Sequence, residues 1–191
     1  MKNHNYLLIA YIIMWAVIFI LPFYSSELYS IIRNTTSQLG AQHTPNAWIM
    51  NLTFILLGLG SIASGWGVLR GYAFHRVVLI LFGLSLVLTA FFHHAPIDKS
   101  VEFDLQQDWL HSLFASTTGF SFTIFALSVA FIVQKKIDGI IAAGAGILAT
   151  ALSMLMFSLP GWMGIWQRFI FILCFGWLIY LFWDTDRLKK R

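Results

Sequence analysis

Histidines and aspartates gather in the segment between the third and fourth apolar runs of the sequence. The segment begins with His93 and His94, and it ends with Asp108 and His111, which lie three residues apart. On a helix this spacing puts both side chains on one face, where a carboxylate can orient an imidazole ring and favour its charged form. Such a pair can transfer a proton, so His111, Asp108 and Asp98 are the candidate catalytic residues.

The same segment has two simpler interpretations. Its acids, including Asp104, can solvate a loop and stabilise the positive N-terminus of the helix that follows. The segment also contains side chains that bind metals, although their spacing matches no standard zinc motif such as H-E-x-x-H. We therefore favour no metal and predict no cofactor. The candidate metal ligands are His93, His94, His111 and Asp98.

A second polar group is predicted on the same side of the membrane. Arg168 lies about six residues inside the last apolar run, roughly 9 Å below its end at 1.5 Å per residue. A guanidinium at this depth needs a partner, so we expect Arg168 to face protein or a polar cavity, with an acidic residue or anionic head group within reach. The alternative is that Arg168 snorkels to the surface. We expect Asn46, Asn51 and His111 to be its polar neighbours.

Two functional hypotheses follow from these residues. The first is a protein that binds a lipid or small amphipathic ligand in an outward-facing polar pocket, where Arg168 holds an acidic head group. The alternative is an intramembrane lipid-modifying enzyme that uses His111 and Asp residues, with or without a metal. Transport is disfavoured, because an ion or proton path would need ionisable residues in the inner halves of the runs, and we identify none there. The sequence leaves open whether the protein is an enzyme.

Six apolar runs must position these side chains. The chain of 191 residues is 59% hydrophobic and 10% charged, which leaves too few polar groups to cover a water-soluble domain. Runs near or above roughly 17 residues can cross a bilayer as helices, and the alternating pattern of a membrane barrel is absent. We predict an all-α integral membrane protein, a six-transmembrane-helix bundle forming one membrane domain over residues 1–191. The expected spans are residues 6–24, 47–69, 74–92, 109–133, 137–159 and 162–183.

The distribution of basic residues predicts the orientation. Nine Lys and Arg residues flank the runs on the side of the termini, whereas only Arg33 and Lys99 flank them on the other side. By the positive-inside rule both termini are then cytoplasmic and the membrane is the cytoplasmic (inner) membrane. These short flanks form no basic face, so we predict membrane lipid and no nucleic acid as partner. The nine are Lys2, Arg70, Arg76, Lys135, Lys136, Arg187, Lys189, Lys190 and Arg191.

Four groups of short motifs resemble a known family. They are Ser37-Gln38-Leu39-Gly40; Pro45-Asn46-Ala47-Trp48 with Asn51 and Gly58; Pro96-Ile97-Asp98 with His111 and Ala115; and Gly164-Ile165-Trp166-Gln167-Arg168. On these motifs, which extend across most of the chain, it resembles the bacterial and archaeal membrane family catalogued as domain of unknown function 998. The resemblance implies a compact helical membrane domain and no established reaction. It supports the choice of outward-facing residues without naming their ligand.

Overall fold

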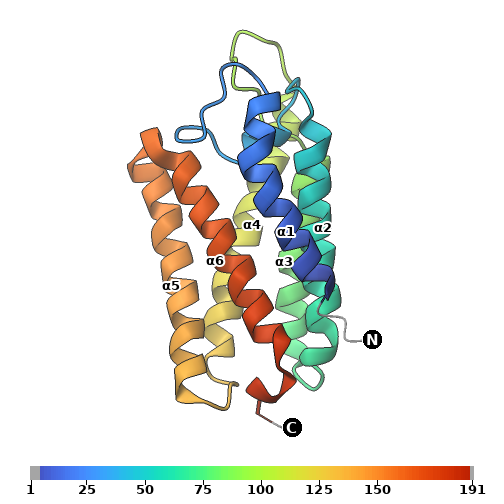
Figure 1. Ribbon diagram of the computed structural model, residues 1–191, viewed down its shortest axis with the longest axis vertical. Coiled ribbons are helices and arrows are strands. Elements are labelled where there is room, and N and C mark those ends of the chain that lie inside the picture. Colours follow the sequence, from blue (N-terminus) through green and yellow to red (C-terminus); the bar gives the residue numbers. More distant parts are fainter. Residues whose placement is uncertain (1–4, 190–191) are drawn as a thin grey trace.

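The computed structural model describes residues 5–189, and it contains six long helices that run side by side (Figure 1). Each helix, with its short 3-10 extension where one adjoins, is long and apolar enough to cross a membrane. No strand occurs among the described residues. The prediction of an all-α, six-helix membrane protein is therefore confirmed. The helices are α1 (Asn5–Ile20), α2 (Ala47–Val68), α3 (Ala73–Phe91), α4 (Leu105–Val129), α5 (Lys136–Ser158) and α6 (Met163–Trp183).

The bundle has two different ends. Both ends of the described chain lie at one end, which we call the terminal end, together with the short turns between α2 and α3 and between α4 and α5 (Figure 1). The opposite end, which we call the loop end, carries the first loop, residues 21–46, and the second loop, residues 92–104. The polar residues singled out by the sequence belong mainly to this loop end.

The helix bounds differ most from expectation in the fourth span. We expected it to begin at residue 109, but α4 begins at Leu105 because the Asp104 carboxylate accepts hydrogen bonds from the Gln106 and Gln107 amides at 2.8 and 3.1 Å. In the first span, α1 ends at Ile20 and a 3-10 turn continues to Tyr24. Pro22 lies in this turn and has no backbone N–H with which to extend the α-helix.

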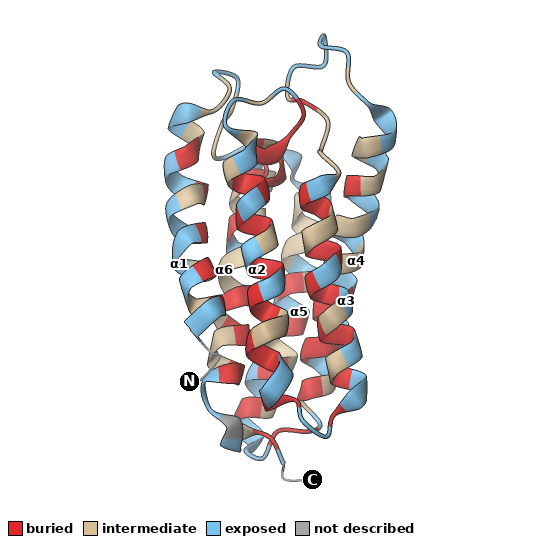
Figure 2. Cartoon of the chain, turned by 90° about the vertical axis from the view of Figure 1, so that its right-hand side faces the viewer, coloured by how far each residue is buried: buried red, intermediate tan, exposed pale blue. Residues whose placement is uncertain are grey.

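Close backbone contacts hold the first three helices together. A Cβ atom built on Gly58 of α2 would overlap the carbonyl oxygen of Gly83 in α3, and the reverse overlap also occurs. Only glycine permits this approach, which lets the two helices pack over their backbones. On the other side of α2, the Leu7 amide of α1 donates to the Ser64 hydroxyl at 3.3 Å. The α1 helix buries a narrow stripe and exposes most of its other residues (Figure 2).

The first loop folds into the loop end instead of extending away from it. Its residues 35–42 are almost all buried, and they appear as a buried segment between the helix ends (Figure 2). A 3-10 turn, Ser37–Gly40, lies within this stretch. Buried backbone needs hydrogen-bond partners, so side chains from the neighbouring helices must supply them.

Candidate functional site

Arg168 is the main anchor of the first loop. Its side chain is buried in the loop-end half of α6, with 3% of the residue exposed. All of its N–H groups have acceptors. Nε donates to the Ile18 carbonyl oxygen at 3.3 Å, and Nη2 donates to the same oxygen at 3.2 Å and to the Tyr29 hydroxyl at 2.8 Å. Nη1 donates to the carbonyl oxygens of Ile31, Asn34 and Gly164 at 2.9, 3.2 and 2.9 Å.

These contacts correct the expected environment of Arg168. It faces protein, as expected, but among residues 5–189 no carboxylate forms an ion pair with it. Neutral carbonyl dipoles and the hydroxyl of Tyr29 stabilise the charge instead. An anionic head group would have to displace one of these acceptors. We therefore assign Arg168 to holding the first loop.

Two neighbours of Arg168 on α6 complete this anchor. The Gly164 amide donates to the Ile32 carbonyl oxygen at 3.0 Å, and a side chain at Gly164 would overlap carbonyl oxygens of the first loop. One turn along, the Gln167 Oε1 atom accepts from the Thr36 amide at 2.6 Å and from its hydroxyl at 2.7 Å. The first loop therefore rests directly on the α6 backbone.

The two asparagines also hold the first loop. The Asn51 amide group donates to the Gly40 carbonyl oxygen at 3.2 Å, and the Asn46 amide group donates to the Tyr24 carbonyl oxygen at 2.8 Å. Asn46 has a φ of 59°, a left-handed conformation that asparagine adopts more readily than most residues. The structure thus brings Asn46, Asn51 and Arg168 to one loop, where each donates to the protein backbone.

Gln42 joins the first loop to the second. Its Nε2 group donates to the carbonyl oxygens of His93 and Asp104 at 3.1 and 3.0 Å, and its Oε1 atom accepts from the Asp104 amide at 2.8 Å. The Gln42 amide itself donates to the His94 carbonyl oxygen at 2.9 Å. The two loops therefore form one connected cover over the loop end.

His111 lies beneath this cover, on α4, with 3% of the residue exposed. Its Nδ1 atom is 3.0 Å from the Thr89 carbonyl oxygen and 2.8 Å from that of Phe92, at the C-terminal end of α3. Carbonyl oxygens only accept, so Nδ1 carries a proton, and in the neutral ring Nε2 then carries a lone pair. That Nε2 atom is buried and has no hydrogen-bond partner in the described chain.

His94 and Asp108 complete what we call the His111 cluster. The rings of His94 and His111 meet edge to face with centroids 5.3 Å apart. The His94 Nδ1 atom lies 3.6 Å from Asp108 Oδ1 and donates to the Ala95 carbonyl oxygen at 2.9 Å. The side chains of His94 and Asp108 are each 30% exposed. The cluster thus combines a buried hydrogen-bond acceptor with two partly exposed polar groups.

The side-chain hydrogen bonds of Asp98 and Asp104 do not involve His111. Asp98 accepts from the Ser100 hydroxyl and amide at 2.7 and 2.9 Å, and these hydrogen bonds lower the pKa of its carboxyl group. Hydrogen bonds from the amides of Gln107 and Gln106 and from the Gln107 side chain likewise lower the pKa of Asp104. Asp104 is therefore a helix cap. In residues 5–189 no three His, Cys, Asp or Glu side chains are grouped to hold a metal ion.

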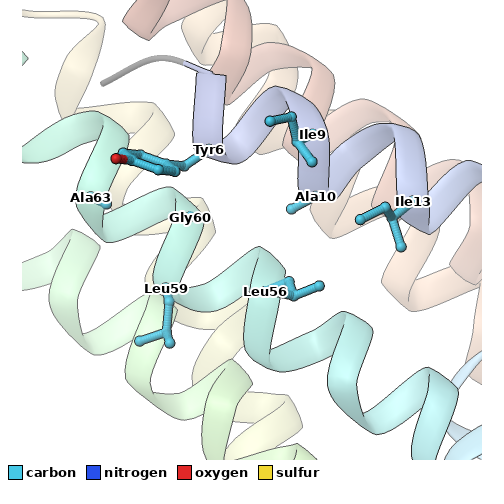
Figure 3. A pocket seen from close by; sticks show the side chains of 8 residues that line it. All are labelled: Tyr6, Ile9, Ala10, Ile13, Leu56, Leu59, Gly60 and Ala63. Atoms are coloured by element: carbon cyan, nitrogen blue, oxygen red, sulfur yellow. The ribbon is translucent and has the colours of Figure 1, made fainter. Parts of the chain in front are cut away.

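An apolar cavity of about 300 Å³ lies away from these groups, between α1 and α2 (Figure 3). Its lining comes from Tyr6, Ile9, Ala10 and Ile13 on α1 and from Leu56, Leu59, Gly60 and Ala63 on α2. Apart from the Tyr6 hydroxyl these side chains carry no polar group. The cavity therefore has space for a hydrocarbon chain, but its lining contains no charged or nucleophilic side chain that suggests catalysis.

A partly buried ion pair lies at the terminal end. Asp138, in the first turn of α5, accepts from the Tyr180 hydroxyl at 2.6 Å and from Arg187 Nη1 at 3.0 Å. The Arg187 guanidinium lies 3.8 Å from the centre of the Tyr180 ring. From the sequence, Arg187 was predicted only as a flanking charge, and no role was predicted for Asp138. An isolated acid at the start of an apolar run was the available signal.

A family model matches almost the whole chain, over residues 8–184. The chain belongs to the family described as "Protein of unknown function (DUF998)". Searches of the curated proteins and of the solved structures find no match.

This assignment confirms the resemblance seen in the sequence. Several of its motif residues now have structural roles. The Asn51 side chain donates a hydrogen bond to Gly40, and the Asn46 side chain donates one to the start of the first loop. Gln167 and Arg168 form hydrogen bonds with the middle of that loop. His111 is different, because its Nε2 atom is a buried acceptor without a donor among residues 5–189, whereas Trp166 Nε1, also without a partner there, can only donate. Within this family member, the His111 cluster is thus the candidate functional site.

Proposed function

We propose that this membrane protein binds the polar head of a lipid or small amphipathic molecule at the His111 cluster. One observation carries the proposal: the Nε2 atom of His111 is buried, bears a lone pair and has no donor among the described residues. A buried acceptor without a donor costs about 1–3 kcal/mol, which a ligand hydroxyl or ammonium group would recover.

The charge at the cluster favours a hydrogen-bond donor over an acid. Asp108 uses one carboxylate oxygen to accept from the Ala95 amide at 2.7 Å, and its other oxygen has no hydrogen bond in the described chain. Its partial exposure leaves a negative group beside His94. We therefore propose a hydroxyl or ammonium head group at His111, in place of the acidic head group that the sequence led us to expect at Arg168.

The basic residues also suggest how the protein is oriented in the membrane. The described basic flanks Arg70, Arg76, Lys135, Lys136, Arg187 and Lys189 belong to the terminal end. With the positive-inside rule this supports a cytoplasmic terminal end in the inner membrane, with the loop end outside. The ligand would then come from the outer leaflet or from the external solution.

The experiment compares His111→Asn with His93→Asn. Asparagine can keep the donor that His111 offers to Thr89 and Phe92 while removing the Nε2 acceptor. Lipids that co-purify with each variant are measured by mass spectrometry. We expect His111→Asn to retain about fivefold to tenfold less of a hydroxyl-headed or amine-headed lipid, as the loss of one buried hydrogen bond predicts. Equal retention by both variants would refute lipid binding at Nε2.

The intramembrane enzyme is the second candidate. The observation that favours it is the same lone pair, because an imidazole fixed in this tautomer can act as a general base. The lipid measurement separates the two functions when head-labelled lipids are also followed over time. Turnover by the wild type that His111→Asn abolishes, with lipid still retained, would favour the enzyme.

A further inference from the structure

A second cavity, of about 440 Å³, lies at the terminal end of the bundle, whereas the His111 cluster lies at the loop end. We call it the lysine pocket. It is lined by the turn between α4 and α5, by the first two turns of α5 and by the C-terminal segment, which we define as residues 184–189 after α6. Three lysines contribute to its lining, Lys135, Lys136 and Lys189, together with the side chain of Gln134.

The C-terminal segment is held against this pocket by several hydrogen bonds. The Gln134 amide donates to the Arg187 carbonyl oxygen at 2.7 Å, and the Lys189 amide donates to the Ile132 carbonyl oxygen at 2.9 Å. The ion pair between Asp138 and Arg187 fixes the same segment from α5. These contacts place Lys189 beside two lysines that are more than 50 residues earlier in the sequence.

The charge of the lysine pocket is not neutralised within the described chain. Lys135 and Lys136 are exposed, and their ammonium groups have no hydrogen bond or ion pair there. Lys189 donates one N–H to the Phe131 carbonyl oxygen at 2.9 Å, which leaves two donors available. No Asp or Glu among the described residues lines the pocket, and Asp138, in the first turn of α5, is buried and paired with Arg187. The pocket therefore suits an anion.

One wall of the pocket is apolar and continues into the membrane-facing surface. Ile140 and Ala143 of α5 line the pocket, and Ile140 is 58% exposed. Phe131, in the turn between α4 and α5, is 79% exposed. A ligand that joins an anionic group to a hydrocarbon chain would satisfy both parts of this lining.

We propose that the lysine pocket binds the phosphate group of an anionic phospholipid, with an acyl chain lying along the apolar wall formed by Ile140 and Ala143. Basic pockets between transmembrane helices are suited to such head groups, and each nearby lysine contributes about fivefold to the affinity. Free inorganic phosphate has the same charged group but no hydrocarbon chain. This proposal is independent of the function proposed for His111.

The test uses the full-length protein in detergent and native mass spectrometry. Wild type, Lys135→Gln/Lys136→Gln and the control Arg70→Gln are each mixed with equal amounts of dioleoyl phosphatidylglycerol and dioleoyl phosphatidylcholine. The double variant leaves the Lys189 hydrogen bond to Phe131 in place, so the pocket keeps its backbone structure. Arg70 is an exposed basic residue at the same end of the bundle.

We expect wild type and Arg70→Gln to retain phosphatidylglycerol in preference to phosphatidylcholine. We expect the double variant to bind phosphatidylglycerol roughly 25-fold more weakly, which corresponds to two lysine contacts. Equal retention of both lipids by the wild type, or an equal loss in Arg70→Gln, would overturn the proposal. So would thermal stabilisation by inorganic phosphate without any preference for phosphatidylglycerol, because the pocket would then bind free phosphate.

Discussion

The guanidinium of Arg168 donates to the hydroxyl of Tyr29 at 2.8 Å, joining a membrane helix to a loop residue 139 positions earlier. Burial raises the pKa of the Tyr29 hydroxyl, although the neighbouring Arg168 charge opposes this rise. The phenol therefore stays neutral and accepts the hydrogen bond. Because the other acceptors of Arg168 are carbonyl oxygens, one side chain organises much of the first loop.

Arg168→Leu should destabilise the protein by at least about 3 kcal/mol, because it leaves several buried carbonyl oxygens without donors. Arg168→Lys should be less harmful than leucine but still destabilising, since an ammonium group cannot replace the planar fork. Thermal unfolding in detergent measures both changes. Arg33→Leu, an exposed change in the same loop, is the control. An Arg168→Leu protein as stable as this control would contradict the anchoring role.

Gly164→Ala should also destabilise the protein, by about 1–3 kcal/mol, because the new methyl group would overlap carbonyl oxygens of the first loop. Gly161 provides a matched control, because a Cβ there meets no other atom within 4 Å. Thermal unfolding of the two alanine variants gives the comparison. Equal stability of both would mean that the first loop does not rest on α6.

Asp138 and Arg187 should show energetic coupling at the terminal end. Asp138→Asn removes the charge that pairs with Arg187, and Arg187→Gln removes the partner, so each single change should cost about 2–3 kcal/mol. The double variant should lose less than the sum of the two. A double-mutant cycle from chemical unfolding measures this coupling. Strictly additive losses would show that the pair does not hold the C-terminal segment.

The orientation predicts which residues an external reagent can reach. A cysteine that replaces Lys99, in the second loop, should react with a membrane-impermeant maleimide in intact cells. A cysteine that replaces Arg70, at the terminal end, should react only after the membrane is opened. The native Cys174 is buried and should give little background. Labelling of position 70 in intact cells, with position 99 protected, would reverse the proposed orientation.

The sequence predicted the helices better than the contacts of the candidate site. Apolar runs are visible because lipid requires them over the length of each span. The burial of Arg168 was also predictable from its depth. Its acceptors were not, because Ile18, Ile31 and Gly164 contribute only backbone oxygens, and every residue type carries those.

The same limit applies to the polar residues of the second loop. Asp104 and Asp108 had two possible roles in the sequence, and only the fold separates them. Asp104 caps α4, whereas Asp108 lies beside His94. The unpartnered Nε2 atom of His111 could not be predicted either, since it depends on where α3 ends relative to α4.

The most direct measurement is an experimental structure of the wild-type protein in nanodiscs made from its native membrane lipids, with attention to the surroundings of His111. We expect density for a hydroxyl or ammonium head group about 3 Å from Nε2, a hydrogen-bond distance. Density for an apolar side chain packed against Nε2, with no ligand head group within hydrogen-bond distance of that atom, would contradict the proposal.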